Sequence, residues 1–449
     1  MKLALFGVGN AGVRIVDRLL AAEAEAERPF VDGQVLAVNT TPSTFAAADH
    51  IPDDRQVVVG DTHPDVVAPD PDAESEDDDS AGESTRREGV AGDPELAVEA
   101  AQDDLPELRR ALDSIDDTEV DAAMVVAGFG GGTGCGVGAV LLDELTSIYE
   151  VPVYALGVLP TSAESDRRAW TAARAIRTFV PLADAVFPVD NEAWSTGGDA
   201  AENYAGINGA IATRIVSLFG AGERDDELLS ELRMDPNDIM RTLDVGGLAT
   251  VGYTMRDLDP ETEGWLTKLR RLVGLSVPEP EAQADAMTIK HLVKRAVESK
   301  LTLPCNVSSA DRVLLVLSGP PKELSRKGFE TGRKLLEDET GTVEILAGDE
   351  PLSEASSITA TVLLSNVTDV PRVEAIQRRA VAFQRELAES ERHGTDDGPE
   401  TERTDDGPET ERTDGDGHGF DFQDEELLEQ PTEESDDETP QQSADSSSE

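Results

Sequence analysis

The glycine-rich run from Gly128 to Gly138 carries the clearest chemical signal in the sequence. The apolar stretch 121–127 before it is typical of a buried strand, and 139–145 has the composition of a helix. A glycine loop between a strand and a helix brings backbone N–H groups and the positive end of the helix dipole together, where they bind phosphate. The loop has no lysine, so it is not a P-loop. A flexible turn is the alternative, which the flanking elements disfavour.

A second glycine motif lies at the N-terminus. Residues 2–6 predict a first strand, and 7–12 follow the pattern G-x-G-x-x-G ahead of a predicted helix. In this context the motif is typical of a Rossmann dinucleotide site. Such a site places an Asp or Glu after the second strand to bind the ribose, whereas the predicted strand 34–38 ends in Asn39. The missing acid weakens the interpretation as an NAD-dependent oxidoreductase, which stays an alternative.

Predicted strands and helices alternate through the first half of the chain. A strand at 152–159, a helix at 167–179 and a strand at 185–189 continue the pattern. This alternation predicts an α/β fold with a doubly wound parallel sheet. A long helix, 202–219, then leads to further strands and helices.

Composition divides the chain into three parts. We expect an α/β domain at 1–220, joined by the long central helix to a smaller α+β domain at 221–392. The segment 393–449 is too polar to bury a core, so we expect a disordered acidic tail. The stretch 61–85 is rich in Asp, Glu, Pro and Ser and lacks Lys and Arg, which predicts an acidic insertion in the first domain.

The charge of the chain is extreme, with 93 Asp and Glu against 38 Lys and Arg and a net charge of -55. Such a surface argues against nucleic acid and anionic membranes as partners, and it is typical of a halophilic protein. The two cysteines, Cys135 and Cys305, form no disulfide framework and suit a reducing cytoplasm. We see no signal peptide and no apolar run long enough for membrane insertion.

Residues 130–136, Gly-Gly-Gly-Thr-Gly-Cys-Gly, resemble the G-G-G-T-G-[ST]-G signature of the tubulin/FtsZ superfamily. With the motifs at 152–160, 190–194 and 370–372, the chain is most similar to the archaeal CetZ group, over roughly 1–390. The resemblance implies a GTP-binding cytoskeletal protein with Mg²⁺ held through the phosphates and a role in cell shape. It also implies self-association into filaments, in which the next subunit completes the site that hydrolyses GTP. Other tubulin-like proteins are further candidate partners.

The resemblance also implies which residues bind GTP. They are Gly9, Asn10, Ala11, Gly12, Val13 and Arg14 in a first phosphate loop, Gly130, Gly131, Gly132, Thr133 and Gly134 in the main loop, and Glu164, Arg168, Asn191, Tyr204 and Asn208. A carboxamide offers both a donor and an acceptor to guanine. Tyr204 shares a helix face with Asn208 and could stack on the base. The alternatives are a surface ion pair for Glu164 and Arg168, and a packed core aromatic for Tyr204.

Asp235 and Asp238 match the acidic loop that one subunit of this superfamily inserts into its neighbour's nucleotide site. There, carboxylates orient a water for attack on the γ-phosphate. The sequence Asp-Pro-Asn-Asp is also a helix start, with an N-cap, a proline at N1 and an acid at N3. Both interpretations can hold, since a cap also fixes a carboxylate in place. We expect no metal ligands from the protein itself.

Three residues depart from the superfamily pattern. Cys135 replaces Ser or Thr, Arg233 stands where bacterial FtsZ has Asn, and Asp93 stands where the γ-phosphate loop usually has Asn. A carboxylate beside a phosphate is repulsive unless a cation lies between them. These departures leave open a second function: a non-hydrolysing GTP-binding scaffold or a regulator of other tubulin-like filaments.

Overall fold

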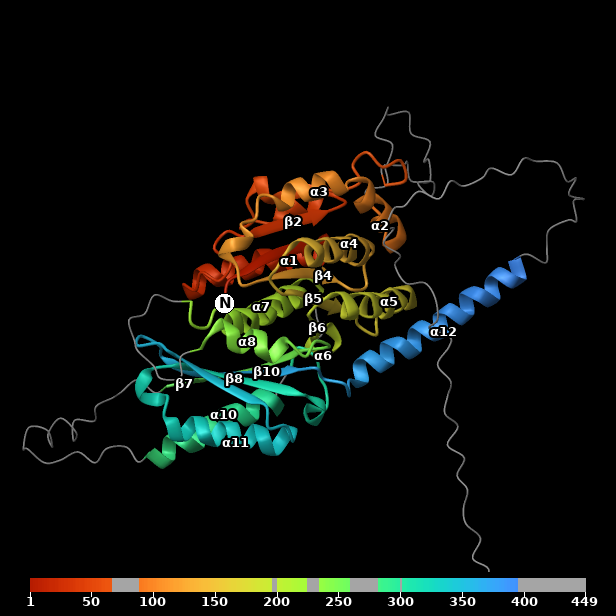
Figure 1. Ribbon diagram of the computed structural model, residues 1–449. Helices are drawn as coiled ribbons and strands as arrows, with labels where there is room; N and C mark the ends of the chain where they lie inside the picture. The colour runs from red at the N-terminus through yellow and green to blue at the C-terminus, as the bar shows by residue number, and fades with distance from the viewer. Residues whose placement is uncertain (67–88, 196–199, 224–233, 259–281, 299–300, 395–449) are drawn as a thin grey trace, which may run out of the picture.

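The structure is a computed structural model, and it describes all residues except 67–88, 196–199, 224–233, 259–281, 299–300 and 395–449. The predicted acidic insertion from residue 67 onward, the predicted tail from residue 395 onward and Arg233 lie outside the described residues. Figure 1 shows two sheet-containing layers, with α7 between them.

Six parallel strands form the first sheet, in the order β3-β2-β1-β4-β5-β6. They are β1 (Leu3–Val8), β2 (Val35–Asn39), β3 (Gln56–Val58), β4 (Ala122–Gly128), β5 (Val153–Leu159) and β6 (Ala185–Asp190). The strand order reverses at β1, which pairs with β2 on one side and β4 on the other. In open parallel sheets, ligands bind beyond the carboxyl ends of the strands at such a switch point. The predicted doubly wound parallel sheet is confirmed.

Helices cover both faces of this sheet. They are α1 (Gly9–Ala26), α2 (Pro94–Asp103), α3 (Leu105–Leu112), α4 (Gly132–Ile148), α5 (Asp166–Leu182), α6 (Asn191–Trp194) and α7 (Ala200–Phe219), with short 3-10 helices at Pro42–Ala47, Asp53–Arg55 and Asp117–Glu119. Side chains of β1 alternate between the faces. Leu3 and Leu5 pack with α1 and α7, whereas Ala4 and Phe6 pack with α2, α4 and α5.

The second sheet has the order β7-β10-β8-β9, with β8 and β9 parallel and the other pairs antiparallel. Its strands are β7 (Thr250–Asp257), β8 (Arg312–Gly319), β9 (Ile345–Pro351) and β10 (Ser357–Ser365). Its helices are α8 (Pro236–Leu243), α10 (Ala282–Glu298) and α11 (Arg326–Thr340), with 3-10 helices at Val307–Ser309 and Pro321–Glu323. The last helix, α12 (Pro371–Gly394), follows β10 and packs against α5. Leu315 packs outward with α10 and α11, and Leu314 packs inward with α7 and α8.

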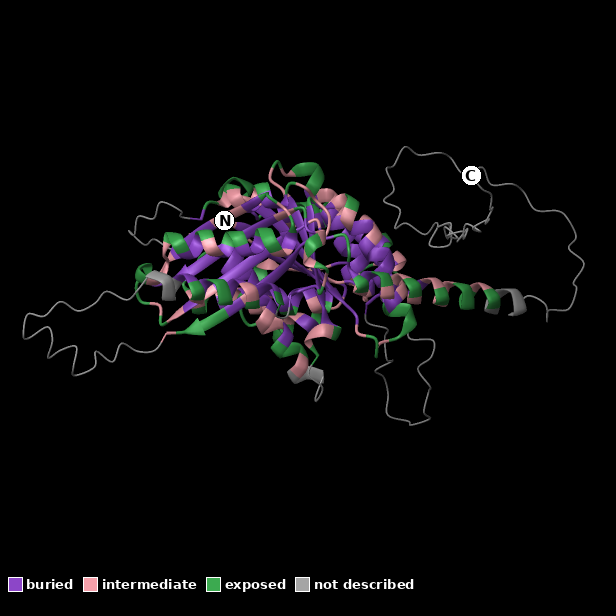
Figure 2. Cartoon of the chain, turned by 90° about the horizontal axis from the view of Figure 1, so that it is seen from below, coloured by how far each residue is buried: buried purple, intermediate pink, exposed green. Residues whose placement is uncertain are grey.

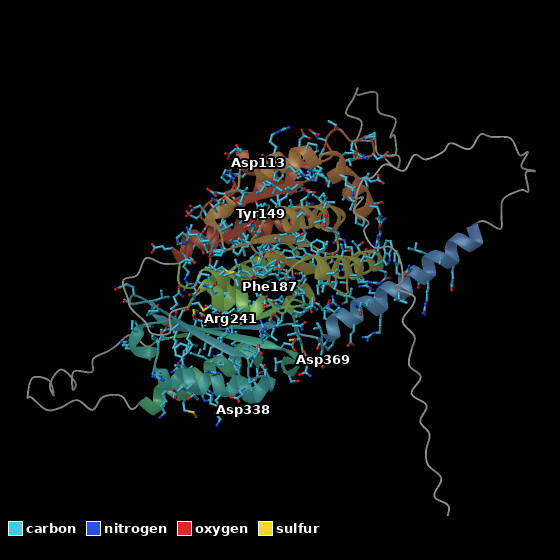
Figure 3. All side chains as sticks on the ribbon, in the orientation of Figure 1. Asp113, Tyr149, Phe187, Arg241, Asp338 and Asp369 are labelled. Atoms are coloured by element: carbon cyan, nitrogen blue, oxygen red, sulfur yellow. The ribbon has the colours of Figure 1, made fainter. Side chains whose placement is uncertain are left out.

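Helix α7 joins the two sheets through a continuous core. Ile207, Ile211 and Ile215 lie on one face of the helix and are all buried. At its end the ring of Phe219 lies 5.9 Å from that of Phe187, which Figure 3 marks in the interior. Figure 2 shows buried residues filling both layers, while α12 extends outward with many exposed positions. No described helix is long and apolar enough to cross a bilayer.

Arg28, just after α1, and Glu350, on β9, form a buried ion pair between the two layers. We expect Arg28→Met to lower the free energy of unfolding by about 3–5 kcal/mol, because Glu350 would remain as an unpaired buried charge. The double variant with Glu350→Met should recover most of that loss, since apolar replacement of a whole buried pair is close to neutral. Urea denaturation followed by circular dichroism measures both. A double variant no more stable than Arg28→Met would contradict this account.

Candidate functional site

A cavity of about 460 Å³ opens beyond the carboxyl ends of the first sheet's strands, at the switch point between β1 and β4. Its principal lining residues are Gly9, Asn10, Ala11, Arg14, Asn39, Thr40, Thr41, Gly89, Val90, Ala91, Gly92, Gly128, Gly130, Gly131, Gly132, Thr133, Gly134, Pro160, Glu164, Arg168, Asn191, Tyr204 and Asn208. The structure therefore brings nearly all of the predicted GTP-binding residues to one place.

Two helices begin at this cavity without a side-chain cap. α1 follows Val8 and α4 follows Gly131, and neither preceding residue caps its helix with a side chain. By contrast, side chains of Asp93, Ser165 and Asp190 cap α2, α5 and α6. The first-turn amides of a helix have no partner within the helix. At α1 and α4 these amides and the helix dipoles form an anion-binding geometry.

The loops at the cavity pack backbone against backbone. Gly9 has φ +68°, a left-handed conformation, and a Cβ there would lie 3.0 Å from the Gly134 nitrogen. A Cβ on Gly132 would lie 2.6 Å from the nitrogen of Asp93 and 2.7 Å from its oxygen. The glycine at position 132 thus lets the 89–93 loop approach the start of α4.

A polar network behind these loops was missed by the sequence analysis. Asn39 Nδ2 donates to Asn10 Oδ1 over 2.8 Å, and the Thr44 hydroxyl donates to the same oxygen. The hydroxyls of Thr40 and Thr133 lie 2.8 Å apart, which connects the end of β2 to α4. Asn39 therefore orients Asn10, instead of holding a ribose as the acid of a Rossmann site does. The position of Asn39 at the end of β2 could have predicted this contact. β2 runs parallel to β1, and the carboxyl ends of parallel strands meet at one edge of the sheet.

Three of the residues that line the cavity come from α6 and α7. Asn191 is only 6% exposed, and its Oδ1 is buried without a hydrogen-bond partner among the described residues. Tyr204 is 40% exposed, so the alternative of a packed core aromatic is wrong. Asn208 lies one helical turn further along α7. An unpaired buried carbonyl oxygen costs free energy, and this one belongs to a residue that lines the cavity.

Glu164 and Arg168 line the cavity and also form the i,i+4 ion pair that was the alternative interpretation. Glu164 Oε1 accepts a hydrogen bond from the Thr161 amide over 2.8 Å. The ion pair of the alternative interpretation is therefore present, and both of its residues lie at the cavity.

Gly12, Val13 and Cys135 do not line the cavity. A Cβ on Gly12 would lie 2.0 Å from the Val126 oxygen, so this glycine lets α1 pack against β4. Val13 is fully buried in the core. The Cys135 thiol donates to the Phe129 oxygen over 3.0 Å, and burial raises the pKa of the thiol. These residues support the loops from behind.

Asp93 is not among the residues that line the cavity, although Gly92 beside it is. It accepts hydrogen bonds from the amides of Glu95 and Leu96, and Arg167 lies 3.9 Å away. Burial raises the pKa of Asp93, but the hydrogen bonds and the Arg167 charge outweigh burial, and the pKa lies below its usual value. Asp93 therefore caps α2, and it keeps its negative charge next to Gly92, which lines the cavity.

Asp235 and Asp238 lie at the start of α8, beyond the end of α7 that is opposite the cavity. α7 carries Tyr204 at the cavity, and its last residue, Phe219, accepts a 2.9 Å hydrogen bond from the Met1 nitrogen, before β1 begins. A Cβ on Gly222, in the next loop, would lie 3.0 Å from the Met234 oxygen. The helix spans about 30 Å, so these aspartates cannot reach the cavity of their own chain.

The predicted cap at Asp235 is confirmed, since its carboxylate accepts from the Asn237 amide over 2.8 Å. Asp238 follows within the first turn of α8. Burial and the nearby Asp235 charge raise the pKa of Asp238 above its usual value, against smaller opposing effects.

The fold and the cavity define a doubly wound α/β protein with two glycine loops at the switch point and a second α+β domain. Residues 2–197 match the family model for the GTPase domain of the Tubulin/FtsZ family, and 197–382 match the tubulin-like CetZ C-terminal domain. The tubulin-like protein CetZ1 of Haloferax volcanii is 38% identical over 393 residues, which cover 87% of this chain and 94% of the relative.

Two solved structures share the fold at full length. CetZ1 from Haloferax volcanii, a GDP-bound monomer, has a TM-score of 0.71 at 35% identity and covers 86% of this chain and 100% of its own. CetZ2 from the same organism, a GTPγS-bound protofilament, has a TM-score of 0.71 at 31% identity with the same coverage. The chain therefore belongs to the CetZ family of tubulin-like proteins. This membership decides against the NAD-dependent oxidoreductase.

The two thiols, Cys135 buried at the start of α4 and Cys305 half-buried, provide a test of the packing. Burial raises the pKa of Cys135, and burial raises that of Cys305 to about 12. We expect both thiols of the folded protein to react with an aromatic disulfide reagent at pH 8 at least 100-fold more slowly than in urea, because the thiolate is the reacting form. Absorbance of the released thiolate measures the rate. Rapid reaction of Cys135 in the folded protein would show that the α4 start is open.

Proposed function

We propose that the cavity binds a guanine nucleotide and that the protein is an assembly-dependent GTPase of the cytoskeleton. The observation that carries the proposal is the convergence of the uncapped starts of α1 and α4 on one cavity. Amides of residues 9–11 and 132–134 would hold the phosphates. The solved relatives carry GDP and GTPγS. We assign nucleotide binding to domain 1–220.

The part of the cavity that α6 and α7 line has groups that could bind guanine. The Asn191 oxygen lacks a partner, and the N1–H and N2–H groups of guanine are donors, whereas the corresponding edge of adenine has an acceptor at N1. Asn208 adds a second carboxamide, and the exposed Tyr204 offers a ring on which the base can stack.

We propose that Mg²⁺ would be coordinated by the nucleotide phosphates and not by side chains of the protein. Glu164 is the one carboxylate among the described lining residues, and its oxygens already accept from Thr161 and Arg168. The cavity therefore fits a Mg²⁺ ion that is coordinated by phosphate oxygens and water, and its chemistry would be to neutralise phosphate charge.

Hydrolysis on this proposal occurs between two subunits in a filament. Asp235 and Asp238 lie at the opposite end of α7 from the cavity, so head-to-tail stacking would bring them to the neighbour's γ-phosphate. The raised pKa of Asp238 suits a group that accepts a proton from water. The solved CetZ2 relative is a protofilament.

In the cell we propose a cytoplasmic filament that controls cell shape, with other tubulin-like proteins as further partners. The alternative is a non-hydrolysing GTP-binding scaffold or a regulator of other tubulin-like filaments. Its motivations are Arg233 and the negatively charged Asp93, which adjoins the cavity-lining Gly92. Nucleotide that binds but is never turned over would favour it.

Asn208→Ala tests the base contact. We expect the parent protein to bind GTP more tightly than ATP, and the variant to lose affinity for GTP by about 1–3 kcal/mol while ATP changes little. Equilibrium binding of fluorescent GTP and ATP analogues in concentrated salt measures both. Equal affinity of the parent for the two nucleotides would refute the guanine assignment.

Asp238→Ala tests catalysis across subunits. We expect GTP affinity to remain, while turnover falls by about 10²-fold or more, as for a lost general base. Phosphate release measures turnover. Mixing with Gly132→Ala, which should impair the phosphate loop, should restore part of the activity, because one variant holds GTP and the other supplies Asp238.

The loss of a helix cap makes a different prediction. It would lower stability by about 1 kcal/mol and leave turnover per folded molecule unchanged. Unchanged turnover in Asp238→Ala, together with a lower melting temperature, would refute the catalytic assignment. Asp244→Ala, an exposed acid that follows α8, is the matched control.

A further inference from the structure

Helix α12 reaches the cavity wall from outside the first domain, although it follows the last strand of the second. It begins after Asp369, which Figure 3 marks at the edge of the second layer, and it packs along α5. Figure 1 shows its far end extending beyond α5. Two of its arginines contact segments that line the cavity.

Arg372 bridges two parts of the wall. Its Nε donates to Asp190 Oδ1 over 3.0 Å, and its Nη2 donates to the carbonyl oxygen of Pro160. Pro160 lines the cavity, and Asp190 caps α6 immediately before Asn191, which also lines it. The Arg372 side chain is 16% exposed and that of Asp190 is 5% exposed. One guanidinium thus holds the β5 and β6 ends in a fixed relation.

Arg379, two turns further along α12, holds the next part of the same wall. It donates to the Asp166 carboxylate and to the carbonyl oxygen of Glu164. Glu164 lines the cavity, so Arg379 fixes its backbone while Thr161 and Arg168 fix its carboxylate. Further along, the ring of Phe383 lies 6.1 Å from that of Trp170 on α5 and anchors the helix.

We propose that α12 is an outer support of the nucleotide site, with Arg372 and Arg379 as positioning residues that hold 160–166 and 190–191 in the binding geometry. The inference rests on the proposed guanine-nucleotide binding. Because coupling between two sites is reciprocal, bound nucleotide stabilises the docked α12, and a docked α12 raises nucleotide affinity. The docking of α12, the helix that precedes the acidic C-terminal segment, thereby depends on whether nucleotide is bound.

The chemistry of arginine explains why this residue type is required. A guanidinium is planar and donates in two directions at once, so Arg372 can satisfy a carboxylate and a backbone carbonyl together. A lysine ammonium keeps the charge but lacks that fork. Arg372→Lys should therefore resemble Arg372→Gln more than the parent, which separates geometry from charge.

The test compares Arg372→Gln with Arg378→Gln on the same helix. Arg378 has the same charge, is 73% exposed and pairs with Glu374, away from the cavity wall. We expect GTP to bind about tenfold more weakly to Arg372→Gln and unchanged to Arg378→Gln. The ratio of GTP to ATP affinity should also fall in Arg372→Gln, because Asn191 is no longer held, and loss of general stability alone would not change that ratio.

Hydrogen exchange of the α12 amides gives the reciprocal measurement. GTP should slow exchange across 371–389 in the parent and in Arg378→Gln, and should have much less effect in Arg372→Gln at saturating nucleotide. Circular dichroism confirms that each variant is folded, and Arg379→Gln serves as a second variant if Arg372→Gln does not fold. Unchanged GTP affinity in the folded variants, or equal losses in Arg378→Gln, would overturn the inference while leaving guanine-nucleotide binding intact. A parent that binds neither GTP nor GDP would refute the proposed function, and the inference with it.

Discussion

Backbone amides without partners at the starts of α1 and α4 are the constraint on which the site depends. A helix start leaves its first N–H groups unpaired, and elsewhere in this chain side chains such as Asp93, Ser165 and Asp190 satisfy them. At the switch point of the sheet no side chain does so, because the residues that precede the two helices are Val8 and Gly131, which carry no polar side chain. An anion is the natural partner of two such helix starts.

The central helix, α7, separates the cavity from the aspartates that are proposed to complete the catalytic site of a neighbouring subunit. α7 presents Tyr204 and Asn208 to the cavity and ends about 20 Å further along its axis, at Phe219, ahead of the segment that carries Asp235 and Asp238. A rigid buried helix of this length keeps the two halves of the proposed catalytic site apart within one subunit. Head-to-tail contact between subunits is the arrangement that joins them. α12 adds a further connection, from the cavity wall to the C-terminal segment.

Much of the candidate site could be predicted from local sequence, because a glycine-rich stretch between a predicted strand and a predicted helix already indicates a phosphate-binding loop. Gly130 to Gly134 lie where predicted, and the i,i+4 spacing of Tyr204 and Asn208 placed both on one side of α7. Asn39 and Thr40 were not predicted to belong to the site, because their role depends on which strands are neighbours. The contacts of Arg372 were equally hidden, since they join residues 182 and 212 positions apart. The role of Asp93 as the cap of α2 was not predicted, because residue type alone does not show which backbone amides a carboxylate will contact.

The dependence of GTP turnover on protein concentration tests the central claim most directly. If the active site is completed by a second subunit, phosphate release per subunit should be negligible in dilute protein and rise steeply above the concentration at which filaments appear. Light scattering recorded on the same samples locates that concentration. A rate per subunit that is independent of protein concentration, or no turnover in filaments saturated with GTP, would contradict the account.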